Sequence, residues 1–384
     1  MEPPLNHCIA QATAFPALLS SQEQIGFQLG WDHAHYRVTP PLPYADEPTS
    51  LRSGWLAGQA AFGARVLPAG RAVHQWLQLR LSAWLRGLSV ELIQVTPRYL
   101  EQLEVGFCPI TRVQLDEHSV LSNQARFTRV RNDAGYAAGN LAVLSTKAHQ
   151  TKGNHGFAQA MRFAGQLESG MQNGITGLNA AQWARLAVLG SLVEPMPHAQ
   201  ACGVPLLVLP PNRLRLFNPA QALQAFVSRQ LLVPGWSLRI SRIETLLPGK
   251  VSRQAFQTFF HALLPRVLEA GRNIAAHELR WAIEDAWHHP LVLQRWTAFA
   301  GALSAQQCEA LVLRAHAKRL GQGVVHNFTD HAATDGWSLE SQGQIETLVT
   351  ARHMEMRRAP LPERQRRPTP PLTVAIRQAV LPLH

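Results

Sequence analysis

The segment spanning residues 126–152 constrains the fold of this chain more than any other part of the sequence. Arg126–Arg131 alternates polar and apolar residues, which indicates a short strand. Asn132–Gly139 contains an Asn-Asp pair and two glycines, as a tight loop requires. Leu141–Leu144 is a short apolar run, and Ser145 is a favourable N-cap for a following helix. The segment therefore predicts a strand, a loop, a second strand and a helix.

Together with the upstream run Cys108-Pro-Ile-Thr, this segment resembles the HNH (ββα-metal) endonuclease family. It is similar to the branch whose core reads SxDRI…GYxxGNxxVxSxxANxxK, with Arg in the first strand. The resemblance covers residues 108–153 and implies a small ββα-metal unit embedded in a longer chain. The matching residues are Arg129-Val130, Gly135-Tyr136, Gly139-Asn140, Val143, Ser145, Ala148, His149 and Lys152.

The resemblance implies three catalytic positions, Arg129, Asn140 and His149. In active members an Asp at the end of the first strand binds a divalent metal, and the adjacent His activates water. A middle Asn ties the loop, and a His or Asn on the helix is a second metal ligand. Asn140 falls on the loop position and His149 on the metal-ligand position. The implied cofactor is Mg²⁺ or another divalent metal ion.

Two departures from the family pattern affect the chemistry. Thr128 falls where the metal-binding Asp is expected, and a neutral hydroxyl is a poor ligand for a hard divalent cation. Arg129 falls on the general base, which is normal for the Arg-containing branch, but an Arg side chain stays protonated at pH 7. The catalytic residues are therefore partly replaced. Four nearby side chains could substitute for them: Asp116, His118, Asp133 and His155.

The charge of the chain favours a polyanionic partner. It has 32 Arg and 4 Lys, a net charge of +11 and a pI of about 10.3. A codon bias toward Arg in a GC-rich genome would give the same excess. Within residues 126–152, Asp133 is the single acid, so we expect the cations there to contact nucleic acid, DNA rather than RNA. These cations are Arg126, Arg129, Arg131, Lys147 and Lys152.

These features predict an HNH-endonuclease-like nucleic-acid-binding protein that, if active, hydrolyses phosphodiesters with a metal ion. The alternatives are a catalytically inactive DNA- or RNA-binding module and a ribosome-associated regulatory protein. The last follows from residues 26–63, which resemble ribosome modulation factor through Pro43-Tyr44 and Trp55-Leu-Ala-Gly58. A competing interpretation is two helices packed closely through Gly30, Gly54 and Gly58.

Helical spacing dominates the rest of the chain and predicts a mostly α (α+β), multi-domain protein. Val204–Leu209 and Leu214–Leu216 predict a short hairpin at 204–216 within the C-terminal domain. Expected helices lie near 27–36, 51–62, 71–91, 97, 156–172, 179–192, 220–232, 253–270, 274–287 and 305–320, with caps at Thr96, Asn179, Ser252 and Ser304. The expected divisions are a Gly/Trp helical module (1–65), a helical connector (66–107), the HNH-like unit (108–155), a helical C-terminal domain (156–350) and a basic Pro/Arg-rich tail (351–384).

Cysteine spacing and hydropathy limit the other classes. Cys8, Cys108, Cys202 and Cys308 form no CxxC pair, so we expect neither a zinc site nor a disulfide framework. No apolar run reaches the roughly 18–20 residues that span a bilayer. The first residues lack the basic start and apolar run of a secretion signal. We therefore expect a cytoplasmic bacterial protein with no membrane partner.

Overall fold

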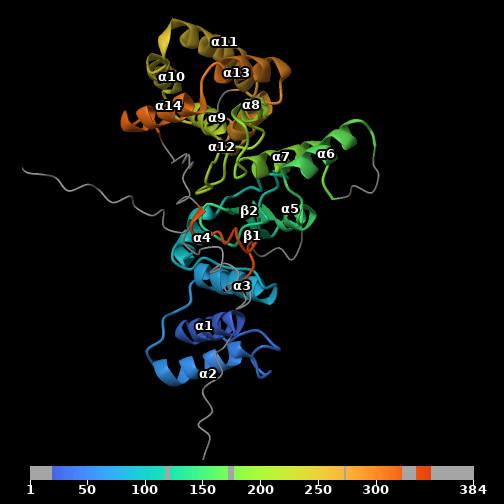
Figure 1. The fold of residues 1–384 in the computed structure, drawn as a ribbon, viewed down its shortest axis with the longest axis vertical. Helices are drawn as coiled ribbons and strands as arrows, with labels where there is room; N and C mark the ends of the chain where they lie inside the picture. Colours follow the sequence, from blue (N-terminus) through green and yellow to red (C-terminus); the bar gives the residue numbers. More distant parts are fainter. Residues whose placement is uncertain (1–19, 117–121, 172–176, 272–273, 322–333, 347–384) are drawn as a thin grey trace, which may run out of the picture.

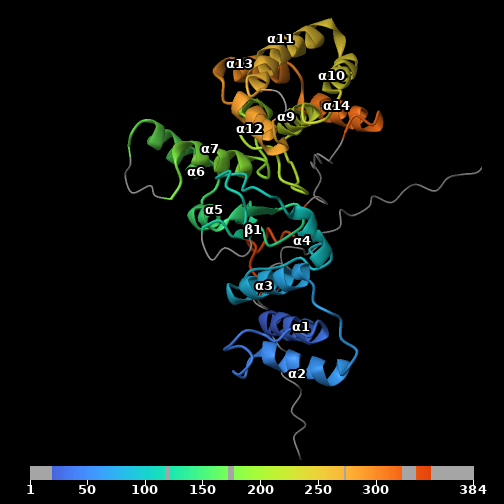
Figure 2. The same cartoon turned by 180° about the vertical axis from the view of Figure 1, so that it is seen from behind.

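The computed structural model describes residues 20–116, 122–171, 177–271, 274–321 and 334–346. These residues form fourteen helices and one two-stranded sheet, so the predicted mostly helical fold with a small β element is confirmed for them. Figures 1 and 2 show the elements following the long axis of the molecule, with the sheet between two groups of helices.

The elements before and within the sheet region are α1 (Ser21–His35), α2 (Ser50–Phe62), α3 (Arg71–Leu85), α4 (Pro97–Leu103), β1 (Ala125–Arg129), β2 (Leu141–Ser145) and α5 (Thr146–Lys152). The remaining helices are α6 (Phe157–Glu168), α7 (Ala180–Ser191), α8 (His198–Gly203), α9 (Pro219–Gln230), α10 (Trp236–Thr245), α11 (Gly249–Leu268), α12 (Ala276–Ala286), α13 (Pro290–Gly301) and α14 (Ala305–Ala317).

Helices α1 and α2 pack against each other at backbone distance. A Cβ atom on Gly30 would lie 1.9 Å from the Leu51 carbonyl oxygen, and one on Gly54 would lie 1.9 Å from the Phe27 carbonyl oxygen. Both positions must therefore be glycine for this packing to form. The predicted close helix pair is confirmed.

Helix α3 connects this pair to the sheet. Arg80, which is 3% exposed, makes an ion pair with Asp32 of α1 at 2.6 Å and lies over the ring of Trp76 at 4.2 Å. Trp76 is buried, and its indole N–H donates to the Val95 carbonyl at 2.7 Å. The polar atoms that α3 buries are thus largely paired, as burial of charge requires. The predicted Thr96 cap of α4 is confirmed by its 3.3 Å hydrogen bond from the Tyr99 N–H.

The sheet joins two hydrophobic cores. β1 and β2 are antiparallel, and Phe127 lies opposite Val143. Alternate residues of β2 enter different cores: Leu141 and Val143 pack with α3 and α4, whereas Ala142 and Leu144 pack with the C-terminal helices. β2 is therefore buried on both faces, which explains its continuous apolar sequence. β1 ends at Arg129, two residues before the predicted end.

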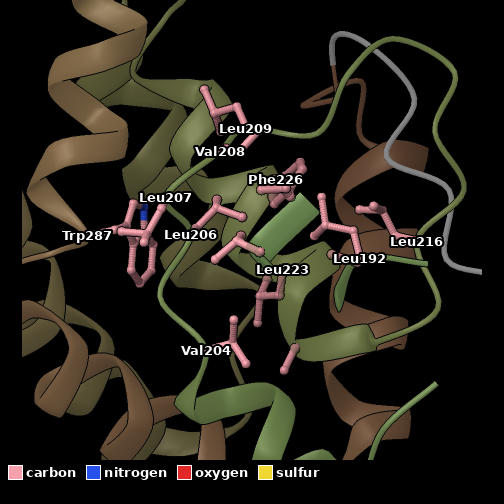
Figure 3. Close-up of a cluster of buried hydrophobic side chains, with 14 of the residues drawn as sticks. Leu192, Val204, Leu206, Leu207, Val208, Leu209, Leu216, Leu223, Phe226 and Trp287 are labelled. Carbon is pink, nitrogen blue, oxygen red and sulfur yellow. The ribbon is translucent and has the colours of Figure 1, made fainter. Parts of the chain in front are cut away.

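The C-terminal helices enclose a large apolar cluster around residues 204–209 (Figure 3). The hairpin predicted at 204–216 is wrong, because β1 and β2 form the one sheet of the described residues. Side chains satisfy the backbone of this extended run instead. Gln224 donates to the Val204 carbonyl at 3.0 Å, and the Leu209 N–H donates to Glu284 at 2.9 Å. Burial between helices replaced strand pairing here.

Helix starts were predicted with mixed success. The caps Asn179 and Ser304 are confirmed, each accepting a hydrogen bond from a backbone N–H three residues on. The cap at Ser252 is wrong, because α11 begins three residues earlier at Gly249. Helices α8, α10 and α13 were not predicted, although His289-Pro290 is a typical helix start.

Residues 334–346 return to the sheet region and pack on the 132–139 loop. Trp337 is fully buried, and its indole N–H donates to the Ala138 carbonyl at 3.1 Å. The Gly135 N–H donates to the Trp337 carbonyl at 2.7 Å. Cys8, His118 and the predicted tail at 351–384 lie outside the described residues. None of the helices in the described ranges has the length and apolarity needed to cross a membrane.

Candidate nucleic-acid interface

The ββα segment is held together by a fully buried Asn140. Its side-chain carbonyl accepts from the Arg131 N–H at 2.8 Å, and its amide donates to the carbonyls of Arg131 and Gly135 at 3.1 and 3.0 Å. The Arg131 N–H is used by this contact, and so β1 ends before it. Asn140 thus fixes the loop between the strands.

The upstream cysteine run closes the other side of the segment. The Ser145 N–H donates to the sulfur of Cys108 at 3.3 Å, and the hydroxyls of Thr111 and Ser145 lie 3.3 Å apart. Ser145 also accepts from the Ala148 N–H, so the predicted cap of α5 is confirmed. The two parts of the sequence pattern, near 108 and near 145, therefore meet in one unit.

His149 of α5 points its Nδ1 at the hydroxyl of Thr128, 2.8 Å away. The Thr128 hydroxyl also donates to the Arg126 carbonyl at 3.2 Å, and a hydroxyl has one proton. When that proton lies on the carbonyl, the ring donates from Nδ1 and its Nε2 is an acceptor. Burial first, and then the positive charges of Arg86, Lys152, Arg126 and Arg129, lower the pKa of His149 to about 4. His149 is neutral at pH 7.

Three of the predicted nucleic-acid-binding cations make internal contacts. The guanidinium of Arg129 donates to the carbonyls of Asn132 and Ala134 at 2.9 and 2.8 Å. Arg131 makes a two-point contact with Asp133, with both bonds at 2.7 Å. Lys152 is 3% exposed, and its ammonium donates to the Asn132 side chain at 2.5 Å. These contacts stabilise the loop between the strands.

The other two predicted cations differ in exposure, and Arg126 is half-buried. Lys147 is exposed on α5. Arg126 bonds through its Nε to the Thr146 hydroxyl at 3.3 Å, and in the described part of the chain it has no acidic partner. It lines a cavity of about 700 Å³ between α3 and the ββα segment, together with His149 and Arg86. Arg86 donates to the Tyr136 hydroxyl at 2.6 Å and likewise makes no ion pair with a described acid.

The donors around His149 do not fit a divalent metal ion. The nearest one is the neutral Thr128 hydroxyl, and the charged neighbours of the ring are cations. The described side chains that could replace the missing catalytic residues have other contacts. Asp133 pairs with Arg131, and His155 packs on Trp183. Asp116 lines a second cavity, next to the one that His149 lines. Across the described ranges there is no group of three or more His, Cys, Asp or Glu side chains that could hold a metal.

Sequence reasoning missed Arg86, because its position next to His149 depends on how α3 packs. A usable pattern was present, since Arg71, Gln75, Gln78, Ser82 and Arg86 recur at three- and four-residue spacing. That spacing places them on one polar face of α3, and all five line the cavity. Comparison with protein-family models, with curated proteins and with solved structures gives no match to this chain.

Proposed function

We propose that this protein is an HNH-like nucleic-acid-binding module that holds the phosphate backbone without cleaving it. The observation that carries the proposal is the cavity beside His149, which is lined by Arg86 and Arg126 and, among the described residues, by no acidic side chain. The expected family resemblance at residues 108–153 agrees with this location. Lys147 adds a phosphate contact on the exposed side of α5.

Electrostatics support binding of an anion at this place. Two guanidinium groups without carboxylate partners repel each other, and this repulsion is relieved when phosphate oxygens accept their hydrogen bonds. Arg is well suited to the task because its planar donors match phosphate geometry. Each phosphate that such a side chain neutralises releases a counterion, which makes the affinity depend on salt. The proposed binding is therefore strongest at low salt.

The residues at the expected catalytic positions are poorly suited to hydrolysis. Phosphodiester cleavage by this family needs a metal ligand on the first strand and a general base next to it. Thr128 and Arg129 occupy those positions, and Arg129 is engaged by two loop carbonyls. His149 remains neutral, but its Nδ1 contacts a hydroxyl rather than a carboxylate that would strengthen it as a base.

The test is incubation of the purified full chain with labelled DNA and RNA in Mg²⁺, in Mn²⁺ and in EDTA, beside a His149→Ala control. We expect salt-sensitive retention of the nucleic acid and intact strands in all three conditions. Metal-dependent nicking that the His149→Ala substitution abolishes would overturn the proposal and make the protein a nuclease.

A further inference from the structure

The cavity between α3 and the ββα segment has the size of a small-molecule site. Its volume of about 700 Å³ lies within the roughly 300–1,000 Å³ that is typical of ligand pockets. The residues that line it belong to α3 on one side and to β1 and α5 on the other, and Figures 1 and 2 show α3 next to the ββα segment. A space of this volume is large enough for one nucleotide-sized group but not for a segment of double helix.

The wall of the cavity contains two kinds of chemistry. At one end lie the cations Arg86 and Arg126 with neutral His149. Along the wall lie side-chain amides, which both donate and accept hydrogen bonds as base edges do. They come from three separate elements, with Gln78 on α3, Gln124 before β1 and Gln150 on α5.

An aromatic ring and a charge gradient complete the site. The ring of Phe127 on β1 is half-buried and lines this cavity as well as the adjoining one of about 760 Å³. The adjoining cavity is lined by the acids Asp116 and Glu104, of which Glu104 pairs with Arg71 at 2.8 Å, so it is less favourable for phosphate than the side with Arg86 and Arg126. A bound strand would therefore leave the cavity toward the basic side, past exposed Lys147 on α5.

We infer that this cavity accepts one unpaired nucleotide, with its phosphate at Arg86 and Arg126 and its base against Phe127 and the amides. The inference rests on the proposed nucleic-acid binding and adds that the bound nucleic acid is single-stranded or locally unpaired. Recognition of unpaired bases by stacking and by edge hydrogen bonds is the usual mode for such strands. In a duplex the base edges and faces that the cavity would contact are already in use.

The experiment compares the full chain's affinity for a short labelled single strand, for the same sequence as a duplex, and for a nucleoside monophosphate as competitor. We expect the single strand to bind about tenfold more tightly than the duplex, as one stacked base provides. We expect the monophosphate to compete only weakly. Equal or tighter duplex binding would overturn the inference while leaving the proposed function intact. Binding of the monophosphate without binding of either strand would also overturn the inference. If the protein retains no nucleic acid at all, both the inference and the proposed function are wrong.

Two substitutions fill the cavity from its rim. Gln78→Trp on α3 and Gln150→Trp on α5 both replace exposed residues that line it, so neither disturbs the buried core. Each should lower single-strand affinity about tenfold and change duplex affinity less than about twofold. Thermal melting shows whether either variant misfolds. Because two variants are made, the test stands if one of them does. A parallel loss for both substrates in both variants would contradict a nucleotide pocket.

Discussion

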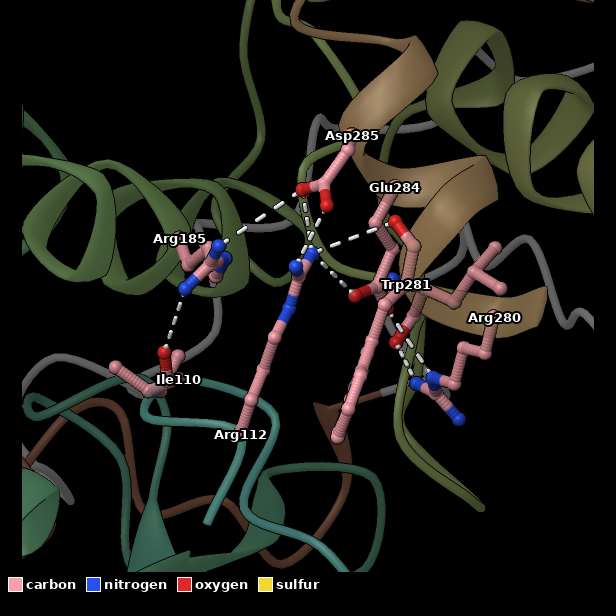
Figure 4. A network of polar contacts seen from close by, with 8 residues as sticks. Ile110, Arg112, Arg185, Arg280, Trp281, Glu284 and Asp285 are labelled. Carbon is pink, nitrogen blue, oxygen red and sulfur yellow. Dashed lines mark hydrogen bonds and ion pairs between the residues drawn. The ribbon is translucent and has the colours of Figure 1, made fainter. Parts of the chain in front are cut away.

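Two groups of arginines in this protein differ in their partners, and the difference separates structure from function. Arg112, Arg185 and Arg280 surround Glu284 and Asp285, where the ββα segment meets α12 (Figure 4). Arg86 and Arg126 surround His149, where the described acids form no ion pair with them. In a chain with 32 arginines, composition cannot distinguish these two groups. The presence or absence of a carboxylate partner does.

The acid-paired group, Arg112, Arg185 and Arg280, joins the segment around Arg112 to α7 and α12. Arg112 donates twice to Asp285, with both bonds at 2.7 Å, and contacts Glu284 at 3.3 Å. Glu284 is 1% exposed and accepts from the Leu209 N–H and from Arg280 as well. Burial raises the pKa of Glu284, and the two arginines oppose that rise. Every strong contact of Glu284 is internal, so this group has little capacity left for a ligand.

The largest effect should come from Glu284→Ala. It removes the carboxylate that two arginines and a backbone amide share, and it leaves buried donors without partners. We expect a loss of about 3 kcal/mol in the free energy of unfolding, measured by urea denaturation. Asp285→Ala is the matched control. The Asp285 side chain is 60% exposed, so this substitution should lower the free energy of unfolding by less than about 1 kcal/mol. Equal losses in the two variants would remove the distinction between a buried and a rim acid.

The group without acidic partners, Arg86 and Arg126 beside His149, should make the stability of the protein depend on pH. The pKa of His149 is about 4 in the folded protein against 6.5 ordinarily, so between these values the unfolded chain binds more protons. The free energy of unfolding therefore falls as the pH drops from 6.5 to 4. After allowance for solvent screening, the fall is about 2 kcal/mol.

His149→Gln should remove most of that pH dependence, which denaturation at several pH values would measure. His289 is a suitable control position, because it lies far along the chain at the start of α13 and its ring accepts the Leu291 N–H. A pH profile unchanged by His149→Gln but altered by His289→Gln would contradict the assignment of the low pKa to His149.

Replacing one arginine of each group by alanine tests the comparison directly. Arg126→Ala should weaken nucleic-acid binding about tenfold and lower the salt slope by about 1, with stability nearly unchanged. Arg112→Ala should do the opposite and lower stability while leaving the salt slope as it is, since its guanidinium is engaged with acids. Fluorescence anisotropy across a salt series and urea denaturation measure the two effects. Similar behaviour of both variants would erase the difference between the groups.

The smallest effect should come from Lys147→Ala. Lys147 is exposed on α5 and would add one phosphate contact at the rim. We expect an affinity loss of about two- to threefold at low salt that disappears at high salt, because solvent screens such contacts. A loss as large as that of Arg126→Ala would move the centre of the interface from the cavity to α5.

Local chemistry made part of this structure predictable. Ser145, Asn179 and Ser304 are caps whose side chains satisfy nearby backbone N–H groups, so their role depends only on neighbouring residues. The glycines of α1 and α2 were predictable from the sequence pattern too, although their role depends on contact between the two helices. The failed hairpin at 204–216 shows the limit, because its extended backbone is satisfied by Gln224 and Glu284 from distant parts of the sequence.

The site was predictable to a similar degree. The motif placed Asn140 and His149 in the segment, and in the structure Asn140 holds the loop, His149 contacts Thr128, and Ser145 contacts Cys108. It could not indicate that Lys152 would be buried or that Arg86 would lie beside His149. Both depend on packing between segments far apart in sequence. The burial of Lys152 also lowers its pKa to about 7, with the charge of Arg129 adding to that effect and Glu194 opposing it.

The most direct test of the account is the salt dependence of nucleic-acid binding in Arg86→Ala/Arg126→Ala, with strand integrity checked in Mg²⁺ and in EDTA. The matched control is Arg253→Ala/Arg295→Ala, which removes two exposed arginines from α11 and α13 at the far end of the molecule. We predict intact strands throughout and a salt slope about 2 lower in the first variant only. Equal slopes in the two variants, or strands cut in a metal-dependent way, would contradict it.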